Sequence, residues 1–127
     1  MIPPIDKLSN LKAAFSKYRE ALVVRRDELH RDGAIQRFEY TLELAWKALK
    51  RELFDRGVEA NSPKEVFRLS AREKLIAGTA RLFDYLEKRN LASRVYREDY
   101  AKTIEEIFDD FESDISALIA NLERPPA

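Results

Sequence analysis

The sequence predicts an all-α protein, an up-and-down four-helix bundle with one additional short helix. Three observations support this fold class. Apolar residues recur at steps of three and four over most of the 127 residues. The period-two alternation that is typical of strands is almost absent, and the three glycines fall near the expected helix ends.

The first two helices are expected over the first 57 residues. The first spans residues 5–23, with Asp6 or the preceding prolines at its start, and it carries one apolar stripe: Leu8, Leu11, Phe15, Tyr18 and Leu22. A charged connector follows, in which Asp32 can cap the second helix. That helix should end near Gly57, and its inward residues are Ile35, Phe38, Leu42, Ala45, Leu49 and Leu53.

Three further helices complete the chain. Ser62, Pro63 and Glu65 form a capping-box arrangement that opens a third helix ending near residue 77. Gly78 stops that helix, and Thr79 can cap a short fourth helix over residues 80–93. One long last helix is expected over residues 98–122. The first, second and last helices can lie side by side as staves, and the other two pack across them or complete the bundle.

Length and composition narrow the class of protein. A chain of 127 residues fits one domain, expected over 1–127, that buries its core without a disulfide or metal. Lys and Arg total 23, as do Asp and Glu, so any basic site must be local. Cysteine is absent and His30 is the only histidine, which argues against zinc, other metals and thiol catalysis. No stretch approaches the ~20 apolar residues of a membrane span, so a soluble protein is expected. The absence of cysteine fits a reducing, cytoplasmic setting, and no cofactor is expected.

Some helices are apolar over more than one face. The second helix also displays Tyr40, Trp46 and Phe54, and the last helix displays Phe108 and Ile119. A two-fold interface would bury both copies of such a surface, so a homodimer is expected. The alternative is that these side chains fill a wide core.

Conventional catalytic patterns find little support. His30 lies in a charged connector, and neither a P-loop nor a G-x-G-x-x-G motif is present. Glu39 and Glu43 stand one helical turn apart, a spacing that can hold a metal or an acid and base pair. Lys47 follows Glu43 by four residues, and we favour a charged helix face.

The segment "EKRNLASRVYRED", residues 87–99, gathers the polar residues that we select as a site: Arg89, Asn90, Ser93, Arg94 and Tyr96. Two guanidinium groups and a phenol can grip a phosphate or stack on a base. The alternative is that the arginines complement helix ends and neighbouring acids. The residues alone leave these two interpretations evenly balanced.

A family resemblance shifts this balance. The stretches "IQRFEYTLELAWK", "NSPKEV" and "RN" with a later Tyr96 resemble the nucleotidyltransferase substrate-binding protein family, and the likeness extends over nearly the whole chain. The resemblance implies a homodimeric, HEPN-like helical bundle that works with a separate minimal nucleotidyltransferase. In the related HepT ribonucleases, an R-x4-H-x-Y motif acts on RNA at the dimer cleft, and its Tyr can receive AMP.

The match to that motif is incomplete. Arg89 matches its Arg and Tyr96 matches its Tyr, but Arg94 stands at the position of the His. Arginine keeps its proton and cannot act as a general base, a loss that typically costs about 10²- to 10⁴-fold in rate. We therefore expect a non-enzymatic partner subunit that binds a nucleotide phosphate, an RNA backbone or an acidic surface. It would present a substrate, or Tyr96 as an AMP acceptor; a degenerate HepT-like ribonuclease toxin is the alternative, and a dimeric scaffold without a ligand is a third hypothesis.

Overall fold

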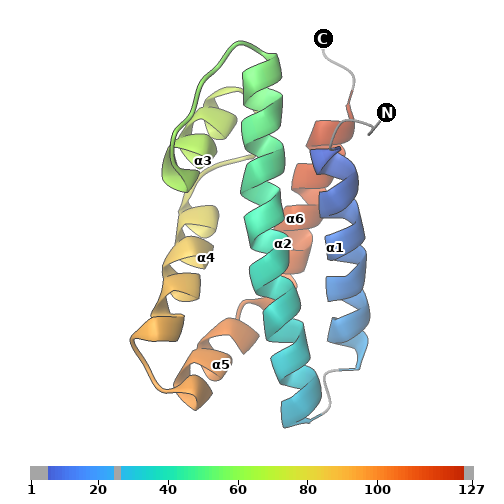
Figure 1. Ribbon diagram of the computed structural model, residues 1–127, viewed down its shortest axis with the longest axis vertical. Helices are drawn as coiled ribbons and strands as arrows, with labels where there is room; N and C mark the ends of the chain where they lie inside the picture. Colours follow the sequence, from blue (N-terminus) through green and yellow to red (C-terminus); the bar gives the residue numbers. More distant parts are fainter. Residues whose placement is uncertain (1–5, 25–26, 125–127) are drawn as a thin grey trace, which may run out of the picture.

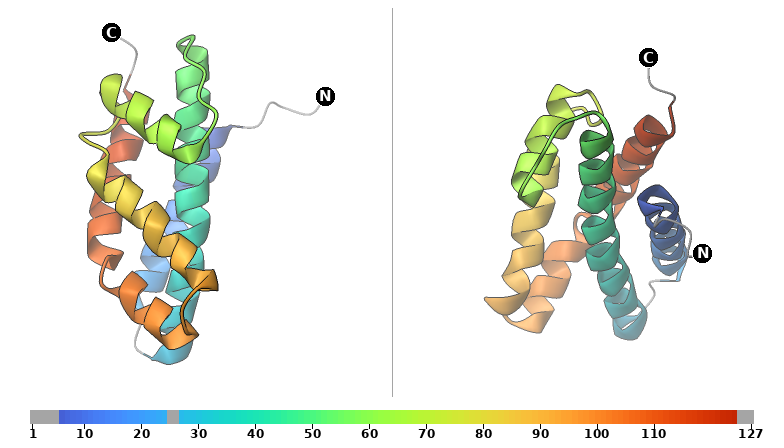
Figure 2. Two further views of the ribbon diagram at one scale, coloured as in Figure 1. Left: turned by 90° about the vertical axis from the view of Figure 1, so that its left-hand side faces the viewer. Right: turned by 45° about the horizontal axis from the view of Figure 1, so that its top comes forward.

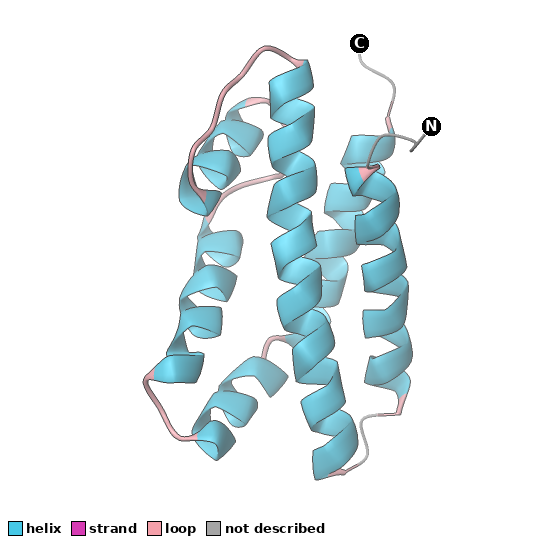
Figure 3. Cartoon of the chain, in the orientation of Figure 1, coloured by secondary structure: helices cyan, strands magenta, loops and turns pink. Residues whose placement is uncertain are grey.

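The computed structural model describes residues 6–24 and 27–124, and this part of the chain is helical without a strand (Figure 3). The all-α prediction is therefore confirmed. The α-helices and their bounds are α1 (Lys7–Val23), α2 (Glu28–Asp55), α3 (Pro63–Arg72), α4 (Ala80–Asn90), α5 (Arg97–Glu105) and α6 (Phe108–Glu123).

Four of these helices form the staves of an up-and-down bundle. In Figure 1, α1 descends, α2 ascends beside it, α4 descends and α6 ascends. Figure 2 shows α3 packed near one end of α2, and α5 crossing the opposite end, below α4. The predicted bundle is confirmed, with two short accessory helices rather than one. No helix in the described ranges has the length and apolar character needed to cross a membrane.

The core is organised around one aromatic ring. Phe111 of α6 is fully buried, and its ring lies 4.6 Å from that of Phe38, 5.3 Å from that of Tyr18 and 5.2 Å from that of Tyr85, measured between centroids. These residues come from α1, α2 and α4, so one side chain joins all four staves. All three contacts are edge-on, the arrangement that aromatic quadrupoles favour.

The second helix begins earlier than predicted. Asp27 caps it by accepting a hydrogen bond from the His30 amide at 2.9 Å, so the predicted cap at Asp32 is wrong. Gly33 consequently lies inside α2, where glycine costs about 1 kcal/mol relative to alanine. Burial of the adjacent Ala34 and Ile35 offsets that cost. The predicted end near Gly57 is confirmed, since this glycine has a φ of 81°.

The third helix ends five residues before the predicted position. Its start is confirmed, because the Ser62 hydroxyl accepts a hydrogen bond from the Glu65 amide at 3.2 Å. Its end comes at Arg72, since Lys74 turns to a positive φ of 62° and the Leu75 amide donates to the Ser70 carbonyl at 2.8 Å. The turn buries Leu75, whose carbonyl accepts a hydrogen bond from α6, so Gly78 is not the stop.

The fourth helix begins at the predicted residue, but without the predicted cap. Thr79 precedes its first residue, and its side chain makes no capping hydrogen bond. α4 ends at Asn90, and residues Leu91–Ser93 continue as a 3-10 turn rather than as α-helix. Leu82 and Tyr85 are its buried residues, and Phe83 and Leu86 are half-buried.

The long last helix is two helices. α5 ends at Glu105, and α6 restarts at Phe108 in a new direction (Figure 1). Between the two helices, the Ile107 amide donates a hydrogen bond of 3.0 Å to the carbonyl of Ile104, three residues earlier, which forms a tight turn. The Tyr18 hydroxyl donates to the Phe108 carbonyl at 2.7 Å, where α6 begins. The break places α5 across the base of the bundle and leaves α6 as a stave.

The expected second apolar surface is only partly present. Phe108 and Ile119 are buried in the core, so for these two residues the alternative of a filled core is correct. Trp46 is half-buried against that core. Tyr40 and Phe54 remain exposed on the outer side of α2.

Candidate functional site

Segment 87–99 forms the corner between α4 and α5. Leu91 is half-buried against the core and anchors the 3-10 turn. Ser93, Arg94 and Tyr96 are exposed, and Tyr96 keeps 84% of its surface accessible. Tyr96 also precedes the first residue of α5 with an extended backbone, and its side chain makes no capping bond. The corner therefore fixes the backbone while its polar side chains face solvent.

Arg89 contacts Glu39, an acidic residue outside segment 87–99 that also binds Tyr100. The Glu39 carboxylate of α2 accepts a hydrogen bond from the Tyr100 hydroxyl of α5 at 2.7 Å. The Arg89 Nε lies 3.5 Å from the same Glu39 oxygen. Burial, and then the hydrogen bond to this carboxylate, raise the pKa of Tyr100. One carboxylate thus joins three helices at the base of the corner.

The two glutamates of α2 therefore differ in role. The predicted charged helix face holds for Glu43, which pairs with Lys47 at 3.1 Å and accepts a hydrogen bond from the Trp46 indole at 3.1 Å. Glu39, one turn earlier, instead faces the corner. In the sequence, the only signal for it was the one-turn spacing of the two carboxylates.

A second attachment joins the start of α5 to the start of α2. Arg31 donates two hydrogen bonds of 3.0 Å to the Glu98 carboxylate, and Arg97 contacts Asp32 at 3.2 Å. The hydrogen bond from Arg31 lowers the pKa of Glu98, and the same bond raises the pKa of Arg31. The turn that carries Arg94 is therefore tied to α2 on both sides.

A hollow of about 440 Å³, the Arg89 hollow, lies beside this corner. Its wall combines an apolar part with charged and amide side chains. The lining residues are Glu39, Leu42, Glu43 and Trp46 of α2, then Ser62, Pro63 and Lys64 at the start of α3, and Leu86, Glu87, Arg89 and Asn90 at the end of α4. These elements are far apart in sequence, so only the folded chain forms the hollow.

The five predicted site residues fall into two groups. Arg89 and Asn90 line the Arg89 hollow, whereas Ser93, Arg94 and Tyr96 do not. Within the described ranges, no ion pair or side-chain hydrogen bond engages Arg94 or Tyr96. In the first group Glu39 contacts Arg89, and the side chains of the second group are exposed to solvent.

The chemistry available here is recognition. Arg89 and Lys64 supply positive charge to a lining that also holds Glu39, Glu43 and Glu87. Asn90 supplies an amide that can both donate and accept. His30 lies in the first turn of α2, where its ring contacts Asp27 at 2.8 Å. Among the residues that the structure describes, no three His, Cys, Asp or Glu side chains form a metal-binding group.

The fold and this corner define a small helical binding domain. The chain belongs to the family described as nucleotidyltransferase substrate binding protein like, whose sequence model matches residues 6–124. The stretches that carry the resemblance in sequence, around residues 35–47, 61–66 and 89–90, contribute to the Arg89 hollow, whereas Tyr96, which belongs to the third of them, does not.

Solved structures share this fold. A crystal structure of a protein from Thermus thermophilus has a TM-score of 0.81 and 33% identity, covering 90% of this chain and 99% of that one. A second structure, from Haemophilus influenzae, has a TM-score of 0.82 and 28% identity, covering 92% of this chain and 99% of that one. It was described as revealing the fold of a substrate binding domain of a nucleotidyltransferase.

A curated relative has a different description. The chain is 30% identical over 97 residues to a probable ribonuclease HepT from Haemophilus influenzae. The match covers 72% of this chain and 66% of that protein, which is just under two thirds of its length.

Proposed function

We propose that this chain is a non-catalytic, homodimeric, cytoplasmic partner subunit of a minimal nucleotidyltransferase. It presents to that enzyme either a bound substrate or its own Tyr96. The supporting observation is the set of residues at the corner. Arg89 and the exposed Tyr96 match the HepT-like motif, and Arg94 occupies the position where that motif has histidine. Arginine stays protonated, so the corner suits binding of anions rather than removal of a proton.

In the sharper form of the proposal, Tyr96 accepts AMP. Its phenol oxygen attacks the α-phosphorus of ATP, a phosphodiester forms, pyrophosphate leaves, and the phenol proton passes to a base of the catalytic subunit. Exposure of 84% leaves the ring accessible to a partner's active site. Arg94, two residues earlier, can pair with the phosphate that arrives.

Mass spectrometry tests this form directly. The purified chain is incubated with the nucleotidyltransferase that co-purifies with it from the native host, together with ATP. We expect a mass increase of one AMP on wild-type protein and none on Tyr96→Phe. The matched control is Tyr40→Phe, another exposed tyrosine, which should still accept AMP. Unchanged labelling of Tyr96→Phe would exclude Tyr96 as the acceptor.

If Tyr96 is not modified, the Arg89 hollow is the proposed place of the substrate. A volume of about 440 Å³ suits a small molecule. Arg89→Ala should then abolish binding of the substrate while complex formation with the nucleotidyltransferase persists. Absence of any nucleotidyltransferase from a pull-down would argue against the proposal as a whole.

The homodimer is proposed through the outer side of α2 near the corner. Tyr40 is exposed next to Glu39, and Val95 is exposed next to Tyr96. A two-fold contact here would bring two copies of Arg89 and Arg94 toward one cleft. Sedimentation at micromolar concentration should give a dimer, and Tyr40→Glu should shift it toward monomer; a monomeric wild-type protein contradicts this part.

A HepT-like ribonuclease remains the second candidate, because a probable ribonuclease is among the relatives. We expect no RNA cleavage by the wild-type protein. Arg94→His restores the missing residue of the motif, and cleavage by that variant alone would identify a degenerate ribonuclease site. Cleavage by the wild-type protein that Arg89→Ala removes would favour this candidate over the first.

A further inference from the structure

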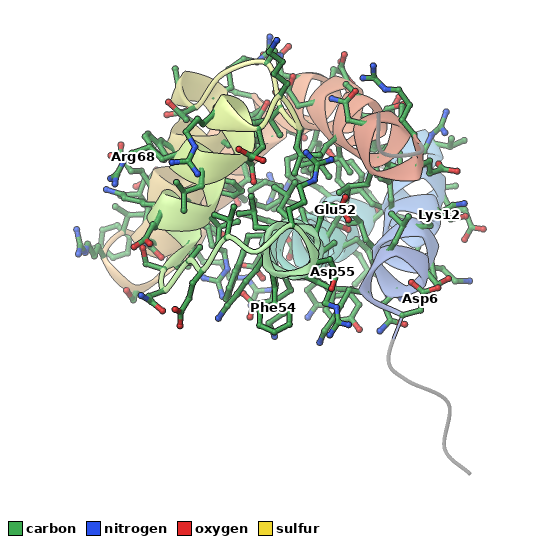
Figure 4. All side chains as sticks on the ribbon, turned by 90° about the horizontal axis from the view of Figure 1, so that it is seen from above. Asp6, Lys12, Glu52, Phe54, Asp55 and Arg68 are labelled. Atoms are coloured by element: carbon green, nitrogen blue, oxygen red, sulfur yellow. The ribbon has the colours of Figure 1, made fainter. Side chains whose placement is uncertain are left out.

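A second hollow, here called the α2 hollow, lies near the C-terminal end of α2 and is separate from the corner. It has a volume of about 410 Å³. Every residue that lines it is cationic or aromatic: Lys7, Trp46, Lys47, Lys50, Arg51 and Phe54. Phe54 keeps 67% of its surface accessible, and Figure 4 shows its ring projecting from α2 away from the bundle.

The lining of the α2 hollow has an uncompensated positive charge. Lys47 pairs with Glu43 at 3.1 Å, and Arg51 pairs with Asp55 at 3.2 Å, so both neutralising acids come from outside the lining. Lys7 and Lys50 have no ion pair or hydrogen bond to any described residue. Because the whole chain has no net charge, this surplus is local and favours an anionic ligand.

The two rings add a planar, apolar surface. The Trp46 indole donates to Glu43, which fixes its orientation. The Lys47 ammonium lies 6.0 Å from the Trp46 ring centroid, and the Arg51 guanidinium lies 5.8 Å from that of Phe54. Exposed aromatic rings beside cations are the combination on which nucleobases stack while phosphates are neutralised.

We propose that the α2 hollow binds a nucleoside di- or triphosphate. The base stacks on Phe54 beside Trp46, and the phosphates pair with Lys7 and Lys50. A compact ligand fits better than a strand, because Glu43 and Asp55 bound the lining along α2 and would repel further phosphates. The volume lies within the range of small-molecule sites.

This site goes beyond the proposed function and does not depend on it. Neither Arg89 nor Tyr96 contributes to the lining. Trp46 lies between the two hollows, since it lines both of them. A ligand in the α2 hollow would therefore change the surroundings of a residue that also borders the Arg89 hollow.

The experiment uses Trp46, the only tryptophan of the chain, as the reporter. The full chain is titrated with ADP and with ATP at low ionic strength, and indole emission is recorded. We expect a saturable change. Lys50→Glu should weaken the affinity for ATP by about tenfold or more, and Phe54→Ala should weaken it by about tenfold through loss of stacking. Added salt should lower the affinity of the wild-type protein. Phe54→Tyr should retain the wild-type affinity.

Controls separate this site from the corner. Arg89→Ala and Lys64→Glu alter only the Arg89 hollow, so the signal of a ligand in the α2 hollow should persist in both variants, and its loss in either would assign the ligand to the Arg89 hollow and overturn the proposal. No saturable change at millimolar ATP, or equal binding by Lys50→Glu, would overturn the proposal. In the Arg89→Ala background, pyrophosphate binding as tightly as ATP, or a single-stranded oligonucleotide binding far more tightly, would also overturn it. A dimer that Phe54→Ala converts to monomer would assign this face to a second copy instead.

Discussion

At the scale of single residues, Glu39 controls the charge that Arg89 can offer to a ligand. Its carboxylate lies 3.5 Å from the Arg89 Nε and accepts the Tyr100 hydrogen bond. Glu39→Gln keeps an acceptor for Tyr100 and removes the negative charge. We expect pyrophosphate to bind the Arg89 hollow up to about fivefold more tightly, the range of a partly exposed ion pair, as measured by calorimetry at low salt.

A neighbouring position provides the matched control for this prediction. Glu43→Gln removes a carboxylate that lines the same hollow but pairs with Lys47. Its effect should be smaller. The gain from Glu39→Gln should also vanish in an Arg89→Ala background; if it persists there, Glu39 does not act through Arg89.

Glu98 is the residue for which we predict a dependence of stability on pH. Its pKa is lowered by the hydrogen bond from Arg31, so the folded state favours the ionised carboxylate. That contribution is present above the ordinary pKa of 4.5 and is lost as pH falls through the lower folded value. Glu98→Gln should therefore lower the urea midpoint at pH 7, and the difference from wild type should shrink at pH 3.

Asp99 is the control for this second prediction. It occupies the same first turn of α5, but the structure shows no ion pair to it within the described ranges. Asp99→Asn should change the midpoint less than Glu98→Gln at pH 7. Equal effects would mean that the N-terminus of α5, rather than the hydrogen bond from Arg31, favours the ionised carboxylate.

These residue-scale contacts differ in how far sequence could predict them. That Arg89 and Asn90 lie together could be read from the sequence, because they are adjacent in one motif. The place of Glu39 was not predictable, since its partners Arg89 and Tyr100 lie about 50 and 61 residues away along the chain. A charge pattern identifies pairs one helical turn apart, as for Glu43, and carries no information about contacts made by folding.

At the scale of helices, the two caps around α3 and α4 allow a direct comparison. The Ser62 hydroxyl caps α3, whereas the Thr79 side chain before α4 makes no such bond. Ser62→Ala should lower the free energy of unfolding by about 1 kcal/mol, and Thr79→Ala by much less. Urea denaturation measures both losses, provided that the dependence of the unfolding free energy on urea concentration is unchanged. Equal losses of stability in the two variants would contradict this assignment of the caps.

Helix boundaries show what local patterns miss. The start of α3 and the end of α2 were predictable because Ser62, Pro63 and Gly57 have strong positional preferences. The break between α5 and α6 was not. The apolar spacing of Ile104, Ile107 and Phe111 continues across it, and neither proline nor glycine marks it. Packing within the bundle ends α5 there, against the local pattern.

At the scale of the whole molecule, stability depends on the ring that joins all four staves. Phe111→Ala removes a fully buried side chain that contacts three other aromatic rings. We expect a loss of about 3–5 kcal/mol in the free energy of unfolding, measured by urea denaturation. Phe54→Ala at an exposed ring should stay within about 0.5 kcal/mol. A large loss at Phe54 would show that this ring is covered in solution.

The fold class was predictable because every stave buries an apolar stripe in the common core, where Phe111 lies. A bundle requires only that each helix present one apolar stripe, and the sequence contains these stripes. The sequence pattern could not predict how the chain assembles with a second copy. Phe108 and Ile119 have the same spacing whether they face the core or a second copy, so periodicity alone could not assign them.

The shortness of α5 has a consequence for motion. A helix of nine residues is marginal by itself, so Tyr100, Ile104 and the two attachments to α2 must keep it folded. We expect α5 and the preceding turn to open as one cooperative unit at lower free energy than the staves. Native-state hydrogen exchange should then be faster for amides 97–105 than for the middle of α2. Such an opening would let Tyr96 reach into another protein while the bundle stays folded.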